Sequence, residues 1–281
     1  ADRYETIATA IAASYMNIPL AHTQGGEITG SIDESVRHAV TKLAHIHFTS
    51  TAESTKNVIQ LGEDPSMVFN TGCPSIDIAR ESKPLDQETF GAYHGTGEVI
   101  SLEKPFLLVA QHPVTTEYGS GQDQIIETIN AISELGIPTI WLWPNIDAGT
   151  EEISKGLRIF RERGGAHVIG FYKNFSPEHF AALLNSTACV VGNSSCGIRE
   201  AAFLGTPAVN IGTRQNGRER GPNVIDVDHD SEQISKAISQ QLSHGPYESS
   251  TLFGSGNTGK LISEKLASLD VVVQKQFFKV S

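Results

Sequence analysis

The chain alternates short apolar stretches with longer segments of helical periodicity, and this alternation is the feature that most constrains its fold. In the second half the apolar stretches are "PFLLVAQHP", "IPTIWLW", "AHVIGFY", "ACVVG" and "TPAVNIG". Between them lie amphipathic segments such as "GQDQIIETINAISELG" and "SPEHFAALLNS", and the latter has a serine cap with proline at its first position. Strands that alternate with helices predict a parallel sheet with flanking helices.

The first eighty residues show the same alternation, with helices predicted over 6–17, 31–47 and 52–62 and strands over 18–23, 47–51 and 67–71. We therefore predict an α/β protein with two Rossmann-like, doubly wound domains. Residues 1–80 would be the remainder of an N-terminal domain that lacks its first part, because the chain opens on a helix without a leading strand. Residues 81–103 are interpreted as a linker, 104–255 as the C-terminal domain and 256–281 as a final helix.

Composition narrows the class of function. Hydrophobic residues make up 39% and charged residues 19%, which is an ordinary globular balance. A formal net charge of -11 argues against a nucleic-acid partner, which calls for a basic face. No apolar run approaches the ~20 residues that span a bilayer, and the three widely spaced cysteines fit a reducing compartment. We expect a cytoplasmic protein without membrane partners.

Polar clusters follow the predicted strands at the positions where parallel sheets bind ligands. In "VVGNSSCGIRE", Ser194 and Ser195 precede a predicted helix start, which favours an anion site, and Glu200 inside that helix could accept from ribose hydroxyls. An ordinary serine N-cap explains the same letters. His112 at a strand exit suits acid–base work or a diphosphate contact, although a lone histidine is more often structural.

Two further stretches are dense in ionisable groups. "GTRQNGRER" places three arginines within seven residues, which suits phosphate recognition or a solvated basic loop. In "AHTQGGEITGSIDESVRH", a Gly-Gly pair permits a tight turn after Gln24, and Asp33 shares a helix face with Arg37. A surface ion pair is the ordinary explanation of that spacing. No GxSxG elbow is present, and the spacing of the histidines at 22, 45 and 47 matches no familiar metal-ligand set.

Together these blocks resemble the UDP-N-acetylglucosamine 2-epimerase family, most closely its hydrolysing branch of sialic-acid synthesis. The blocks are "HTQGGEITGSIDESVRHAVTKLAHIHF", "TGCPSID", "QHPVTTE", "PNIDAG", "GNSSCGIREAAFLGTPAVNIGTRQNGRE" and "GNTGK", and they span essentially the whole chain. The resemblance implies two Rossmann-like domains of the glycosyltransferase-B type, with the active site in the cleft between them and the last helix returning to the first domain. It implies a UDP-sugar substrate, no metal, no cofactor, and a homodimer or homotetramer.

The resemblance also implies roles for individual residues. Asp2, Asp33, His112 and Gln24 match catalytic positions. Positions that hold UDP in the family correspond to Arg3, Asn145, Lys173, Asn174, Phe175, Ser194, Ser195, Glu200 and Arg214. Many members carry glutamate where this chain has Gln24, and an amide cannot take a proton as a carboxylate does. Either the other catalytic groups suffice here, or Gln24 only positions the sugar.

The implied reaction has two stages: elimination of UDP to 2-acetamidoglucal, then hydration to N-acetylmannosamine. Three alternatives stay open. The first is the non-hydrolysing reaction, in which UDP adds back. The second is a hydrolysing epimerase of a UDP-diacetamido-trideoxyhexose on the legionaminic-acid route. The third is a catalytically incomplete fragment that only binds nucleotide sugar.

Overall fold

The computed structural model describes residues 4–164 and 167–279, which divide into two compact units. Unit 1 is formed by the described residues of Ala1–Arg80, Asn216–Arg218 and Thr251–Ser281. Unit 2 is formed by those of Glu81–Gln215 and Glu219–Ser250. No helix in the described ranges is long and apolar enough to cross a membrane.

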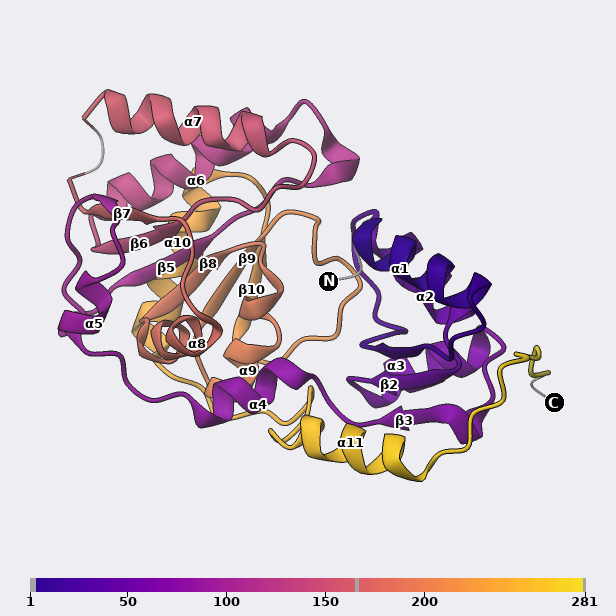
Figure 1. The fold of residues 1–281 in the computed structure, drawn as a ribbon. Helices are drawn as coiled ribbons and strands as arrows, with labels where there is room; N and C mark the ends of the chain where they lie inside the picture. The colour runs from indigo at the N-terminus through magenta and orange to yellow at the C-terminus, as the bar shows by residue number, and fades with distance from the viewer. Residues whose placement is uncertain (1–3, 165–166, 280–281) are drawn as a thin grey trace. The chain divides into compact units, whose positions relative to one another are not determined.

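Unit 1 contains a three-stranded parallel sheet in the order β1-β2-β3 (Figure 1). In chain order its elements are α1 (Tyr4–Tyr15), β1 (Ala21–Thr23), α2 (Asp33–Leu43), β2 (Ile46–Thr49), α3 (Ala52–Gln60), the 3-10 turn η1 (Pro65–Met67), β3 (Val68–Asn70), α4 (Pro74–Glu81) and α11 (Thr258–Ser268). The central strand β2 is buried along its whole length. Its register pairs His22 with His47 on one side and His47 with Val68 on the other.

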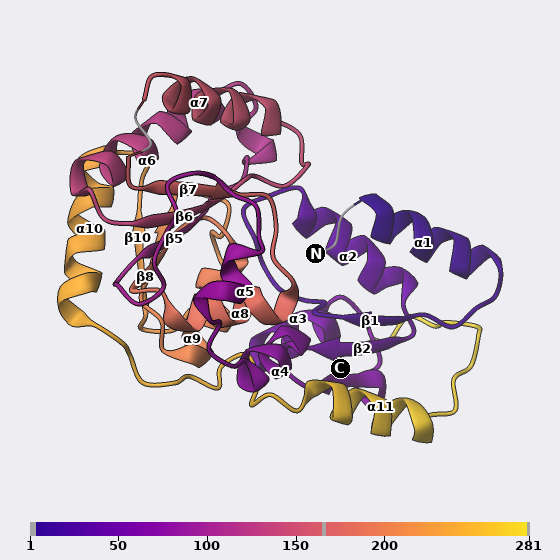
Figure 2. The ribbon, with the colours of Figure 1, turned by 60° about the vertical axis from the view of Figure 1, so that its left-hand side comes forward.

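Helices cover both faces of this small sheet. Figure 2 shows α1 and α2 together on one side and α11 on the other. The core is made by side chains that these elements turn inward, among them Val40, Phe48, Val58 and Ile76, each at most 2% exposed. Each parallel crossover of this sheet runs through a helix: α2 joins β1 to β2, and α3 with η1 joins β2 to β3.

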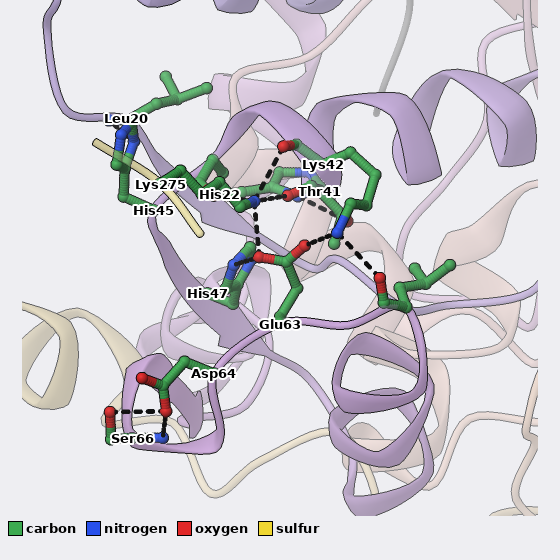
Figure 3. A network of polar contacts seen from close by, with 12 residues as sticks. Leu20, His22, Thr41, Lys42, His45, His47, Glu63, Asp64, Ser66 and Lys275 are labelled. Atoms are coloured by element: carbon green, nitrogen blue, oxygen red, sulfur yellow. Dashed lines mark hydrogen bonds and ion pairs between the residues drawn. The ribbon is translucent and has the colours of Figure 1, made fainter. Parts of the chain in front are cut away.

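The last described residues, 271–279, form an extended segment that we call the C-terminal strap. It belongs to unit 1 and is fixed to it by Lys275, whose Nζ donates to the carbonyl oxygens of Thr41, Lys42 and Ala44 at 3.0, 2.9 and 2.5 Å. The same Nζ lies 2.6 Å from Oε2 of the buried Glu63 (Figure 3). The strap therefore places a cation at the carbonyl end of α2, where the helix dipole favours it.

Glu63 is the centre of that polar network. Its carboxylate also contacts Lys42 Nζ at 2.5 Å and His47 Nε2 at 3.0 Å (Figure 3). Burial opposes ionisation of Glu63, but the hydrogen bonds from His47, Lys275 and Lys42 outweigh it and lower the pKa of Glu63 to about 2. The network therefore carries a charged carboxylate at neutral pH.

Unit 2 contains a seven-stranded sheet in the order β10-β9-β8-β5-β6-β7-β4. Its strands are β4 (Thr96–Gly97), β5 (Leu107–Ala110), β6 (Thr139–Leu142), β7 (Ile169–Tyr172), β8 (Cys189–Gly192), β9 (Ala208–Ile211) and β10 (Val224–Val227). The helices and 3-10 turns are α5 (Gln87–Gly91), η2 (Thr115–Glu117), α6 (Gly121–Leu135), α7 (Thr150–Glu162), α8 (Pro177–Ser186), η3 (Ser195–Gly197), α9 (Glu200–Leu204) and α10 (Ser231–His244). All pairings are parallel except that of the edge strand β4 with β7.

The strand order makes unit 2 a doubly wound sheet. The chain builds β5, β6 and β7 outward in one direction, then returns to the other side of β5 to add β8, β9 and β10. Figure 2 shows α6, α7 and α10 on one face and α5, α8 and α9 on the other. Alternate residues of β5 feed the two cores: Leu107 and Val109 pack with the first set of helices, and Leu108 packs with the second.

Several expectations need correction or completion here. Residues 81–103 are not a bare linker, because they supply α5, β4 and the fully buried Phe90 and Ile100 to unit 2. The helix expected from Cys196 is split into η3 and α9. Strand β10 and helix α10 were not predicted at all. The Ser176 cap is confirmed, since its side chain accepts from the His179 amide.

Candidate functional site

The polar side chains of unit 2 gather where the sheet changes winding direction, between β5 and β8. His112 follows β5, Asn145 follows β6, Ser194 follows β8 and Arg214 follows β9. Because these strands are parallel, their carboxyl ends meet at one edge of the sheet, and ligands of doubly wound sheets bind at this switch point. The structure thus brings together sequence-predicted residues that are up to 102 positions apart (214 minus 112).

His112 is a neutral imidazole in this environment. Burial, with the Arg214 guanidinium as a smaller cause, lowers the pKa of His112 to about 3. Its Nδ1 accepts a hydrogen bond from the Asn145 amide at 3.2 Å. A ring nitrogen that accepts from an N–H group carries no proton, so the proton of the neutral ring resides on Nε2. His112 is therefore a hydrogen-bond donor through Nε2 at neutral pH.

Arg214 is anchored by main-chain and acidic groups around the same edge. Its Nη1 donates to the Asn193 carbonyl oxygen at 3.1 Å, and its Nη2 lies 4.0 Å from Asp147 Oδ2. Asp147 also accepts from Asn145 Nδ2 at 2.5 Å. A guanidinium presents its donors in one rigid plane, and these contacts fix the direction of that plane at the edge of the sheet.

Ser194 and Ser195 lie at the exit of β8. Ser194 caps η3 by accepting from the Cys196 amide at 3.5 Å, and Ser195 Oγ accepts from Arg199 Nη2 at 3.0 Å. Glu200 is the first residue of α9 rather than an interior one. Its Oε2 is buried and accepts no hydrogen bond from the described residues, although Arg199 Nε lies 3.8 Å away. An acceptor of this kind is suited to a hydroxyl donor.

The three residues that follow β7, Lys173 to Phe175, differ in their exposure to solvent. Lys173 and Asn174 are exposed, whereas Phe175 is 5% exposed and its ring lies 4.6 Å from that of Tyr93 and 5.3 Å from that of Tyr172. The Phe175 ring belongs to the core of unit 2. A ligand at this position would meet Lys173 and Asn174, not the phenylalanine ring.

The expected cluster of phosphate-binding arginines does not form. Arg218 belongs to unit 1 and pairs with the buried Glu27, Nη2 to Oε2 at 3.1 Å. Arg220 pairs with Asp226 and donates to the Gln215 carbonyl at 2.7 Å. Of the three arginines, Arg214 is the one that contacts Asn193 at the end of β8, so it stays in the candidate site.

In unit 1, Gln24 directly follows β1 and has a left-handed backbone, with φ of 62°. A non-glycine residue rarely adopts this conformation, and such strain concentrates at functional positions. Its Nε2 contacts Cys73 Sγ at 2.7 Å, and Cys73 Sγ also contacts Ser75 Oγ at 2.9 Å. The residue two positions on, Gly26, has φ of 79°, and any Cβ there would overlap the Ser54 carbonyl oxygen. The predicted tight turn is confirmed at Gly26.

A hollow of about 420 Å³ lies beside this turn. It is lined by Glu5, Thr6, Thr9, Ala10, Leu20, Ala21, His22, Thr23, Gln24 and Val40. Asp33 is the first residue of α2, and Arg37 donates to the Glu27 carbonyl at 2.8 Å. Asp2 and Arg3, which the sequence analysis assigns to catalysis and UDP binding, lie outside the described residues. No group of three or more histidines, cysteines or acids arranged for a metal occurs in ranges 4–164 and 167–279.

Sequence reasoning did not select Asn193, which contacts His112 and Arg214, or Cys73, which contacts Gln24. Asn193 is completely buried, and Cys73 is too. The one available signal for Asn193 was its place immediately after a buried strand, next to the two serines. The sequence alone does not distinguish an asparagine side chain that binds a ligand from one that binds the main chain.

Comparison with known proteins gives a consistent result. The family model described as UDP-N-acetylglucosamine 2-epimerase matches residues 1–267. The chain belongs to the UDP-N-acetylglucosamine 2-epimerase family. A relative from Legionella pneumophila, named UDP-N,N'-diacetylbacillosamine 2-epimerase (hydrolyzing), is 35% identical over 95% of this chain and 69% of its own length. One from Neisseria meningitidis, named UDP-N-acetylglucosamine 2-epimerase, is 31% identical over 100% and 74%.

A solved structure supports the fold. The UDP-GlcNAc 2-epimerase from Neisseria meningitidis, bound to UDP-GlcNAc, superposes with a TM-score of 0.72 at 18% identity, covering 94% of this chain and 73% of that one. The prediction of an α/β protein with two domains of the glycosyltransferase-B type is confirmed. Within this 2-epimerase family, the carboxyl ends of the strands in unit 2 are the candidate nucleotide-sugar site.

Proposed function

We propose that this chain carries the site of a hydrolysing 2-epimerase, which converts UDP-GlcNAc and water to N-acetylmannosamine and UDP. The observation that carries the proposal is the neutral, Nε2-protonated His112 beside Arg214 at the switch point of unit 2. A relative at 35% identity has a name that specifies hydrolysis, which favours the hydrolysing outcome over the non-hydrolysing one.

In the first stage a base takes the proton from C2 of the sugar. The C2–H electron pair becomes the C1=C2 bond, and the C1–O bond breaks with its electrons on the diphosphate of UDP. We assign stabilisation of that leaving diphosphate to the His112 Nε2–H group, the Arg214 guanidinium and the two serines after β8. Donors that are already oriented toward developing negative charge contribute most to such a step.

In the second stage water supplies an oxygen to C1 of the 2-acetamidoglucal, and C2 takes a proton on the opposite face. Both stages need side chains that take up and release a proton near neutral pH. His112 does not do this, because its pKa is about 3. We therefore assign proton transfer to carboxylates, Asp33 and Asp2. The Gln24 amide is assigned a positioning role toward the sugar, because its side chain cannot act as a base.

For UDP itself, we assign Glu200 to the ribose hydroxyls and the main chain of residues 173–175, with Asn145, to the uracil. Arg3 would contact the diphosphate. These assignments place most of the binding contacts on the nucleotide, so we expect UDP to bind even without a sugar. Titration calorimetry with UDP, UDP-GlcNAc and UDP-glucose tests that expectation, and Glu200→Gln should weaken all three.

The decisive experiment is incubation with UDP-GlcNAc in D₂O, followed by ¹H and ³¹P NMR. Free UDP together with N-acetylmannosamine that carries deuterium at C2 is the expected result. UDP-ManNAc without release of UDP would establish the non-hydrolysing reaction instead. Binding of UDP without turnover would make the chain a nucleotide-sugar binding fragment.

The sugar is tested in the same assay. The Legionella relative is named for UDP-N,N'-diacetylbacillosamine, so this substrate is the second candidate. We expect UDP-GlcNAc to have the higher kcat/KM, and the reverse order would move the chain to the diacetamido substrate. His112→Ala should lower kcat by about 10²-fold. His94→Ala, which removes an exposed histidine of the same unit, is its matched control.

A further inference from the structure

The ends of β5 and β8 are joined by a side chain and not only by the main chain. Regular pairing of the two strands ends at Ala110 and Gly192, followed by the Asn193 amide donating to the Ala110 carbonyl at 3.2 Å. Beyond that point the Asn193 side chain takes over. Its Oδ1 accepts from the His112 amide at 2.8 Å, and its Nδ2 donates to the His112 carbonyl at 2.8 Å.

An asparagine side chain reproduces one peptide group, with one acceptor and a donor side by side. The Asn193 side chain therefore continues the hydrogen-bond pattern of the sheet by one residue. It binds both the amide and the carbonyl group of His112. The side chain is completely buried, so it is held by these bonds and not by bulk water. With its main chain fixed, the His112 ring meets the Asn145 amide through Nδ1.

Asn193 also holds Arg214, the cationic group at this edge of the sheet. Its own carbonyl oxygen accepts from Arg214 Nη1 at 3.1 Å and from Gln215 Nε2 at 2.8 Å. Gln215 is 2% exposed, so the acceptor position is enclosed. One residue consequently sets the positions of His112 by its side chain and of Arg214 by its main chain.

We propose that Asn193 is a positioning residue for the reaction, holding the His112 imidazole in its Nε2–H form with the donor directed at the leaving diphosphate. This inference rests on the proposed function for the identity of the reaction. Its structural content, that the Asn193 amide determines the position and tautomer of His112, is independent of that function. The two parts are measured separately.

The variants are Asn193→Asp and Asn193→Ser. Aspartate keeps the shape but places a carboxylate oxygen against the His112 carbonyl, and serine is too short to reach both groups. The control is Asn223→Asp, another buried amide of unit 2, whose Nδ2 donates to the carbonyls of Gly197 and Thr206. This control meets main-chain carbonyls but does not contact His112.

Histidine ¹⁵N–¹H correlation spectra give the tautomer, with His112 assigned by its loss in His112→Ala. Wild-type protein should show a protonated Nε2 and a bare Nδ1, and an Nδ1–H form in wild type would overturn the proposal without any variant. Each Asn193 variant should convert His112 to a mixture of tautomers and reduce kcat by about 10²-fold with a smaller change in KM. Asn223→Asp should leave the His112 tautomer unchanged.

A folded Asn193→Asp or Asn193→Ser protein with an unchanged His112 spectrum and unchanged kcat would refute the positioning role. If wild type has no epimerase activity, the proposed function fails while the spectra still decide whether Asn193 controls His112. If the spectra change but kcat does not, Asn193 positions a histidine that the reaction does not use, and the catalytic part of the inference is wrong.

Discussion

Replacement of Lys275 by methionine should open the C-terminal strap while leaving its hydrophobic stem in place. Lys275 Nζ serves three carbonyls at the end of α2 and one oxygen of Glu63. Other strap contacts remain in the variant: the Phe278 amide donates to the Gly62 carbonyl at 3.0 Å, and His45 Nε2 lies 2.9 Å from the Val273 carbonyl. The substitution therefore tests one charge and not the whole segment.

The magnitude follows from what the lysine leaves behind. A cation at a partly buried helix C-terminus contributes about 1 kcal/mol. The ion pair with a carboxylate that is 2% exposed contributes about 2 kcal/mol, which is below the full cost of a broken buried pair because Lys42 and His47 still contact Glu63. We expect the free energy of opening of the strap and the α2–β2 connection to fall by about 3 kcal/mol.

Hydrogen exchange measured by mass spectrometry is the suitable assay. Both tryptophans of the chain, Trp141 and Trp143, lie in unit 2, so their fluorescence does not report on unit 1. A loss of about 3 kcal/mol corresponds to exchange about 10²-fold faster at the amides of residues 44–49 and 278. Peptides of unit 2 provide the internal reference.

Lys279→Met is the matched control, because Lys279 is an exposed lysine of the same strap. It should leave the exchange rates within about threefold of wild type. If Lys275→Met and Lys279→Met behave alike, the four contacts of Lys275 contribute nothing that water cannot replace, and the reasoning is refuted. If Lys275→Met also accelerates exchange across unit 2, the effect is global, and the claim that Lys275 stabilises the strap locally is wrong.

Three further predictions follow from single residues. Because the folded pKa of Glu63 lies at about 2, below its ordinary value of 4.5, its contribution to stability is complete above pH 4.5 and is lost as the pH falls toward 2; urea midpoints of wild type and Glu63→Gln should converge there. Gly26→Ala should cost about 2 kcal/mol or more in urea unfolding, because φ is 79° and the added carbon overlaps the Ser54 carbonyl, whereas Gly91→Ala, which meets nothing within 4 Å, should cost none. His112, with a pKa of about 3, should contribute no ionisation to the pH profile of kcat between pH 5 and 8, and an acid limb near pH 6.5 that vanishes in His112→Gln would contradict this.

The sequence was sufficient to locate the ends of strands but not the partners of the side chains there. His112, Ser194 and Arg214 were selected because each follows a buried stretch, and the doubly wound order brings those ends to one edge. That inference needs only periodicity and topology. Helix α10 shows that the same signal can be overlooked, since Ile234 and Ile238 lie at helical spacing after the Asp230 cap.

The interaction partners of these side chains could not be predicted in the same way, because they lie far away in the sequence and meet only in the folded chain. Arg218 pairs with Glu27 across 191 positions (218 minus 27), and Lys275 contacts Glu63 across 212 (275 minus 63). In sequence Lys275 looks like an ordinary solvated charge, and Arg218 looks like part of a phosphate-binding or a solvated basic loop. Three arginines close together in sequence suggest a phosphate-binding loop. The structure shows that one of them, Arg218, instead pairs with the buried carboxylate of Glu27. A local sequence pattern contains no information about such a distant partner.

Asn193 illustrates why this limit matters most at a reactive centre. A chain can place a histidine at a strand exit by topology alone, but topology leaves the last residue of the strand without a regular partner and the imidazole free to choose its tautomer. The Asn193 side-chain amide provides the missing hydrogen-bond partner, with two bonds of 2.8 Å to the main chain of His112. His112 is thus held by main-chain hydrogen bonds like a residue inside the sheet. The chemistry at this edge consequently depends on a residue whose own side chain is directed at the main chain, which is why a search for reactive side chains in the sequence passes over it.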